Sequence, residues 1–74
     1  MGKLRVLSGQ EVRRILEANG FVLVRQRGSH MVLQRVADGS TTTAIVPDHN
    51  ELHTGTLRSI IRQSGLPRFL FEAD

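Results

Sequence analysis

At 74 residues, the sequence allows one small domain, predicted to span residues 1–74, and leaves little room for a deep cavity, so we expect any functional site at the surface. Cysteine is absent, which excludes disulfides and thiolate zinc sites, and no apolar run matches a signal peptide or a membrane span, so we expect a cytoplasmic protein with no membrane partner. The net charge of +3 is compatible with nucleic-acid binding, and nine of the ten cationic side chains are arginine, which suits bidentate contacts with phosphate.

The first predicted helix covers residues 9–19. Ser8 and Glu11 have the spacing of a capping box, in which each side chain hydrogen-bonds to the backbone of the other residue. Apolar residues then recur at helical spacing, and Gly20 is a typical helix stop.

Three strands are predicted next. Branched and aromatic residues predict strands over 21–26, 30–36 and 41–46. The turn signals between them, Gly28-Ser29 and Asp38-Gly39, are short enough to join antiparallel neighbours. We therefore expect a three-stranded antiparallel sheet.

A polar loop and a second helix are predicted after the third strand. Pro47 ends the strand, residues 48–54 form a polar loop, and a second helix carries an apolar stripe over 57–64 before Gly65 closes it. The apolar residues 68–71 either pack over an exposed edge of the core or form a docking strip for a partner.

The predicted element order is α-β-β-β-α, which is an α+β fold. Because each helix has a single apolar stripe, we expect both helices on one face of the sheet and an open second face.

The first hairpin carries the most informative chemistry. If Gly28-Ser29 is a two-residue loop, Arg27 lies opposite His30 and Arg25 lies opposite Val32. Side chains alternate along a strand, so both arginines and the histidine then project to one side. Histidine exchanges protons near neutral pH, and arginine binds phosphate oxygens. The cluster is therefore either a site acting on a phosphodiester or a solvated hairpin tip with ordinary surface charges.

At this point the sequence resembles the HicA toxins of bacterial HicA–HicB toxin–antitoxin systems. The similarity spans residues 8–66 and is carried by Ser8–Val12, Gly20-Phe21, Arg25–His30, Val46–His49 and Gly55–Ile61. The resemblance implies a fold like that of double-stranded RNA-binding domains. It also implies an endoribonuclease that cleaves mRNA without a metal or other cofactor and is inhibited by a HicB-type antitoxin. The family's active-site histidine falls on His30.

RNA cleavage at such a site needs only proton transfer and stabilisation of the charge on the phosphate. The 2′-hydroxyl is the nucleophile, so His30 would act as a general acid or base while Arg25 and Arg27 stabilise the charge on the phosphate. Ser29 is better interpreted as a turn residue than as a nucleophile, and Gly28 as a residue chosen for its backbone conformation. The predicted RNA-binding residues are Arg25, Arg27, Gly28, Ser29, His49 and Arg58.

His49 is the candidate for a second proton-transfer group. His49 matches the family's Pro-x-His position, but it can equally be a loop histidine that hydrogen-bonds to nearby backbone. His53 is expected on the surface, and no metal site is expected from these two histidines. Arg58 and Arg62 either contact the RNA backbone or belong to a solvated helix face.

Two other functions remain open: a non-catalytic RNA-binding module and an interaction protein. Pure RNA binding does not need a titratable group at His30. Tyrosine and tryptophan are absent and Phe21 is the only aromatic residue on the predicted hairpins, so base stacking is not expected to give strong sequence preference.

Overall fold

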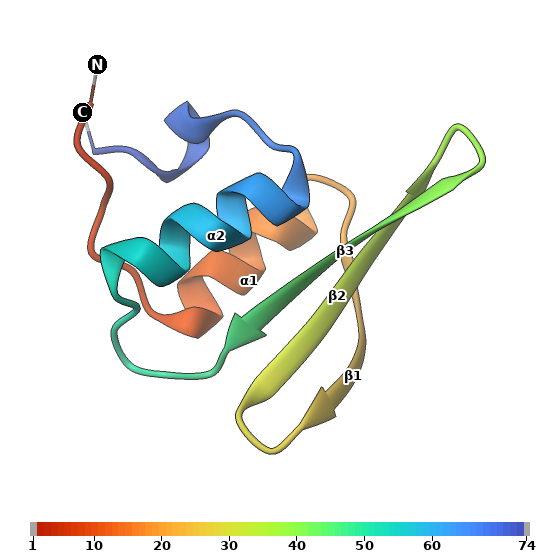
Figure 1. Ribbon diagram of the computed structural model, residues 1–74, viewed down its shortest axis with the longest axis horizontal. Coiled ribbons are helices and arrows are strands. Elements are labelled where there is room, and N and C mark those ends of the chain that lie inside the picture. The colour runs from red at the N-terminus through yellow and green to blue at the C-terminus, as the bar shows by residue number, and fades with distance from the viewer. Residues whose placement is uncertain (1, 74) are drawn as a thin grey trace.

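The computed structural model describes residues 2–73 and has a three-stranded antiparallel sheet with both long helices on one face (Figure 1). The elements in chain order are α1 (Gly9–Ala18), β1 (Val22–Arg27), β2 (His30–Ala37), β3 (Ser40–Pro47), α2 (Thr54–Ser64) and the short 3-10 helix η1 (Arg68–Phe71). The strands lie in the order β1-β2-β3. The α+β fold and the α-β-β-β-α order expected from the sequence are confirmed, and they are compatible with the arrangement that the family resemblance implies.

The ends of α1 and of the strands lie within one residue of the predictions, and the start of α2 differs most. β1 begins at Val22, and the preceding Phe21 is only 2% exposed and donates its N–H to the Leu16 carbonyl of α1. α2 begins at Thr54, inside the predicted loop, and the Leu57 N–H donates to the His53 carbonyl to close its first turn. The apolar stripe marked only the part of α2 that is buried, so it could not reveal this first turn.

The capping box that begins α1 is confirmed. The Glu11 N–H donates to Ser8 Oγ at 3.1 Å, and the Ser8 N–H donates to Glu11 Oε1 at 2.9 Å. Hydrogen bonds from Ser8, first of all that from its backbone N–H, hold the pKa of Glu11 below its usual value. The box therefore fixes where the helix starts and keeps a negative charge at its N-terminus.

One hydrophobic core joins the helices, the strands and η1. Its buried residues come from α1, β2, β3, α2, η1 and the segments that flank them: Leu7, Val12, Leu16, Phe21, Met31, Leu33, Ala44, Val46, Leu52, Leu57, Ile60 and Phe71. The partly buried Leu23 of β1 packs against them. Phe71 is completely buried and Leu70 packs against the cluster, so the apolar end of the sequence packs on the core, whereas Phe69 stays 67% exposed. The two end segments lie side by side (Figure 1), and the Ala73 N–H donates to the Lys3 carbonyl at 2.8 Å.

Arg35 links the sheet to the end of α1. Its guanidinium carbon lies 5.1 Å from the centre of the Phe21 ring, and its Nη1 donates to the Asn19 carbonyl at 3.3 Å. This cationic side chain therefore covers one end of the core through a cation–π contact and a hydrogen bond.

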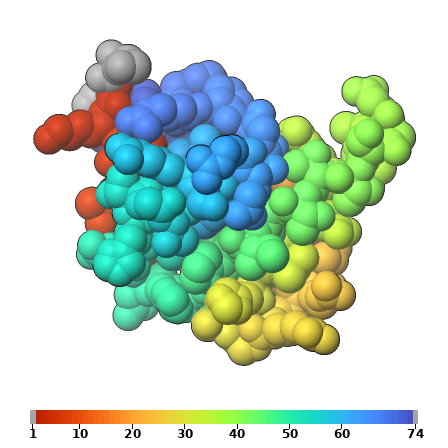
Figure 2. Space-filling view, in the orientation of Figure 1, coloured from red at the N-terminus to blue at the C-terminus, as the bar shows by residue number. Residues whose placement is uncertain are grey.

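The two hairpins end in different surroundings. The β2–β3 turn has positive φ at both Asp38 (52°) and Gly39 (75°), as a type I′ turn requires, and it stands out from the body of the molecule in Figure 2. The β1–β2 turn instead lies near the chain that follows β3. Most of the candidate site residues lie at the β1–β2 turn or on the loop beside it, whereas Arg58 lies on α2.

Candidate functional site

The β1–β2 hairpin has the register that its two-residue loop predicts. Arg27 pairs with His30, and Arg25 pairs with Val32. Because Met31 and Leu33 point into the core beneath the helices, the alternating side chains of Arg25, Arg27 and His30 belong to the opposite, open face. All three are exposed, so the hairpin presents one imidazole beside two guanidinium groups to solvent.

Gly28 and Ser29 shape the turn. Gly28 has a φ of +56°, in the left-handed region, and no atom lies within 4 Å of the place where a Cβ would be. Glycine is therefore favoured there by backbone conformation rather than by lack of space, as the sequence predicts. Ser29 is an exposed turn residue whose carbonyl accepts a hydrogen bond from the Asp48 N–H.

That hydrogen bond ties the hairpin tip to the loop after β3. Pro47 pairs with His30 in the sheet, and the Asp48 carboxylate accepts a hydrogen bond from Gln10 Nε2 at 3.1 Å. The His49 carbonyl in turn accepts the Gly9 N–H at 2.9 Å. The start of α1, the loop and the hairpin tip are thus held together by backbone and side-chain hydrogen bonds.

His49 lies on this loop, one residue from the contact with the hairpin tip. It is exposed, and its imidazole makes no hydrogen bond within residues 2–73. Both interpretations of His49, a second proton-transfer group and a loop histidine, therefore stay predictions. His53 is the N-cap residue of α2, with an exposed side chain that does not cap the helix.

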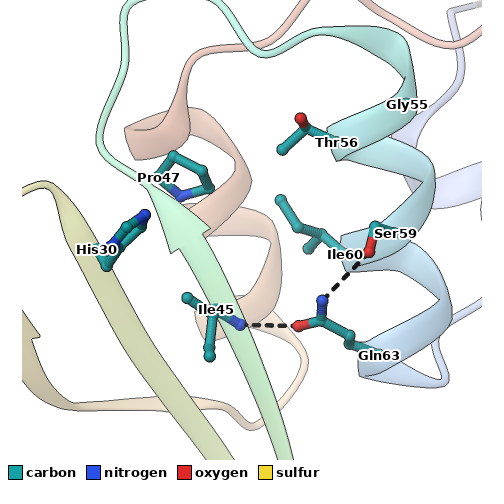
Figure 3. Close-up of a pocket in the computed structure, with 8 residues that line it drawn as sticks. All are labelled: His30, Ile45, Pro47, Gly55, Thr56, Ser59, Ile60 and Gln63. Atoms are coloured by element: carbon teal, nitrogen blue, oxygen red, sulfur yellow. Dashed lines mark hydrogen bonds between the residues drawn. The ribbon is translucent and has the colours of Figure 1, made fainter.

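A pocket of about 480 Å³ lies beside His30, between β3 and α2 (Figure 3). His30 reaches it from β2, Ile45 and Pro47 form the β3 side, and α2 forms the other side. The residues from α2 are Gly55, Thr56, Ser59, Ile60 and Gln63. His30, which is predicted to act on RNA, therefore belongs both to the hairpin tip and to the lining of this pocket.

Sequence reasoning missed the α2 side of this pocket. Ser59 and Gln63 are an i, i+4 polar pair next to the apolar stripe, which is the weak signal that the sequence carries. Arg58, which the sequence did single out, is exposed on α2 and, like Arg62, is not among the residues that line the pocket. The α2 residues that lie near His30 are thus not the arginines that the sequence singled out.

No metal centre is evident in the described part of the chain. Across residues 2–73, no group of three or more histidine, aspartate or glutamate side chains is placed to hold an ion.

Comparison of the sequence with models of protein families gives a match that covers most of the chain. The family model described as HicA toxin of bacterial toxin–antitoxin systems matches residues 9–66, from the first residue of α1 to just beyond α2. The chain belongs to the HicA toxin family. The matched segment contains the hairpin, the loop after β3 and every residue of the pocket.

Membership in the HicA family assigns the chain the toxin role in a toxin–antitoxin system and implies a cognate antitoxin as its partner. A comparison with curated protein sequences gives no significant match. None of the helices described for this HicA toxin has the length and apolar character needed to cross a membrane.

Proposed function

We propose that residues 1–74 form a single-domain endoribonuclease that cleaves mRNA without a metal ion and is restrained by a HicB-type antitoxin. One observation carries the proposal: His30 lies directly across the hairpin from Arg27, with Arg25 on the same open face. An imidazole beside two guanidinium groups matches the needs of phosphodiester cleavage, which are proton transfer and stabilisation of negative charge.

The proposed reaction uses the RNA's own nucleophile. The 2′-oxygen forms a bond to phosphorus, the bond from phosphorus to the 5′-oxygen breaks, and a 2′,3′-cyclic phosphate and a 5′-hydroxyl end result. One proton leaves the 2′-hydroxyl and one reaches the departing 5′-oxygen. His30 transfers one of these protons, and Arg25 and Arg27 stabilise the extra negative charge on the phosphate oxygens.

The remaining RNA contacts follow from the surroundings of His30. His49 is proposed as the second proton-transfer group, because its loop is hydrogen-bonded to the hairpin tip through Asp48 and Ser29. The exposed turn of Gly28 and Ser29 lets the RNA backbone approach closely. Arg58, on the exposed surface of α2, is proposed to contact a phosphate further along the strand.

The test is cleavage of a labelled single-stranded RNA by the wild type and by His30→Ala, each with and without EDTA. We expect EDTA to leave the wild-type rate unchanged and His30→Ala to lower it by at least ~10²-fold. His53→Ala is the matched control, because it removes another exposed histidine outside the cluster and is expected to keep the wild-type rate.

Added imidazole gives a second measurement. If His30 transfers a proton, free imidazole should partly restore cleavage by His30→Ala, whereas a histidine with only a structural role would give no rescue. Full activity in His30→Ala would contradict the proposal.

A non-catalytic RNA-binding function is the second candidate, because the exposed arginines favour phosphate contacts whether or not cleavage occurs. Salt-dependent RNA binding by the wild type without any cleavage would support this alternative.

Coexpression with a HicB-type protein encoded beside the gene tests the proposed antitoxin partner, since the antitoxin should abolish both toxicity and cleavage.

A further inference from the structure

We propose that the pocket between β3 and α2 holds one nucleobase of the RNA, the base attached to the ribose next to the cleaved phosphate, and that Gln63 recognises the edge of that base. This inference rests on the proposed ribonuclease function, and it adds a specificity site in which Gln63 and Ser59, which have no part in the proposed cleavage, lie beside His30. It predicts a base preference at one position of the substrate.

The first argument is position. His30 belongs both to the cationic cluster of the hairpin and to the lining of the pocket. A phosphate that contacts His30 therefore has its neighbouring nucleoside within reach of the pocket mouth, and Figure 3 shows His30 beside Pro47 at one side of that mouth. Thr56, at the start of α2, faces the same space.

The second argument is the match between the pocket and a base. A nucleobase has two apolar faces and one polar edge. The pocket has apolar side chains from Ile45, Pro47 and Ile60, and polar groups from Ser59 and Gln63. Its volume of about 480 Å³ lies in the range of ordinary small-molecule sites. The sequence has no tyrosine or tryptophan to stack on a base, and these aliphatic side chains provide the apolar contact with the faces of the base instead.

The third argument is that the recognition group is already oriented. The Ile45 backbone N–H donates to Gln63 Oε1 at 2.9 Å, and Gln63 Nε2 donates to Ser59 Oγ at 3.3 Å. A backbone N–H can only donate, so this contact assigns the amide oxygen to the Ile45 side. One amide hydrogen and one oxygen lone pair remain, which form a donor–acceptor pair of the kind that reads base edges.

This preorganisation reduces the ordering cost of binding. Both partners of Gln63 belong to elements fixed by the fold, β3 and α2, so the amide does not have to be immobilised when RNA arrives. Gln34 offers the contrast: its amide donates to Thr43 Oγ1 on the sheet, away from the pocket.

The experiment compares three variants with the wild type. Gln63→Leu removes the amide, Ser59→Phe fills the pocket, and Gln34→Leu is the matched control for losing a glutamine. Thermal melting checks that each variant is folded. RNAs with randomised sequence are cleaved, and the cut sites are mapped to give the base preference at each position.

We expect the wild type to prefer certain bases at one position next to the cut, and Gln63→Leu to reduce that preference roughly tenfold. Gln34→Leu should keep the wild-type preference. A wild-type profile with no preferred base at any position, or a Gln63→Leu profile equal to the wild type, would overturn the proposal.

Binding measurements keep this inference separate from the proposed catalysis. RNAs with 2′-deoxyribose at the cut cannot be cleaved, and an abasic site is introduced at each position in turn. An abasic site at one position should weaken wild-type binding roughly tenfold and should have no effect on Ser59→Phe. If the wild type shows this binding pattern but does not cleave RNA, the proposed ribonuclease activity is refuted and the base site is not. Should Ser59→Phe weaken binding of the antitoxin and leave RNA binding unchanged, the pocket would be a protein contact and the base site would be refuted.

Discussion

Replacement of Gly9 by alanine should destabilise the protein, although alanine is the better helix former. Gly9 is the first residue of α1 and is buried against the chain that ends β3. An added Cβ would overlap the Pro47 carbonyl oxygen and would lie 3.0 Å from both the Pro47 carbonyl carbon and Asp48 Cα. All three are backbone atoms, so no side-chain rotation relieves the overlap, and α1 or the 47–48 segment must move.

The size of the effect follows from two opposing terms. Overpacking of this kind costs about 1–3 kcal/mol, whereas exchanging glycine for alanine in a helix returns at most about 1 kcal/mol. Because the overlap is with backbone, the overpacking cost lies in the upper part of its range, about 2–3 kcal/mol, and a helix gain of about 1 kcal/mol leaves a net loss of about 1–2 kcal/mol. For a domain of this size, that loss lowers the melting temperature by about 4–16 °C.

Gly55→Ala is the matched control, because Gly55 also lies in the first turn of a helix but has no atom within 4 Å of its Cβ position. It should melt at or above the wild-type temperature. Circular dichroism of the three proteins during heating makes the comparison. If Gly9→Ala melts as high as Gly55→Ala, the steric reasoning is refuted. Under the proposed ribonuclease function, movement of the 47–48 segment should also lower RNA cleavage by Gly9→Ala, because Pro47 is the sheet partner of His30.

Two further predictions concern the ends of α1. Because Ser8 lowers the pKa of Glu11, the stability that the ionised carboxylate contributes is complete at neutral pH and is lost as the pH falls through that lowered pKa. The free energy of unfolding, measured by denaturation across this acidic range, should fall with pH in the wild type and fall less in Glu11→Gln, which keeps a capping-box residue. The same pH dependence in both proteins would contradict this prediction. At the other end, Arg35→Ala should cost about 1–2 kcal/mol through the lost Phe21 contact and Asn19 hydrogen bond, measured by urea unfolding, with the exposed Arg62→Ala unchanged. An unchanged midpoint in Arg35→Ala would refute that contribution.

The sequence predicted the features that depend on residues close together in the chain. The capping box of Ser8 and Glu11, the turn at Asp38-Gly39 and the register of the first hairpin each involve only a few consecutive residues, and each is confirmed. The roles of His30, Arg25 and Arg27 stay predictions, but their placement on one face follows from a two-residue loop and the alternation of side chains.

The pocket could not be predicted in the same way. Its α2 residues reach His30 only because α2 packs along β3, and the Gln63–Ile45 hydrogen bond joins residues 18 positions apart. Nothing in the local pattern of α2 says which side of its apolar stripe meets a strand edge. The same holds for Gly9, which local reasoning treats as an ordinary helix residue although Pro47 packs directly against it.

The sequence alone thus determined the element order, the helix and turn signals, and the grouping of one imidazole with two guanidinium groups, because short-range geometry and side-chain periodicity decide these features. Only the tertiary structure decided that this group borders a pocket, that Gln63 and Ser59 complete it, and that Phe71 closes the core. Those features depend on contacts between distant segments, whose positions are set by the packing of the whole core.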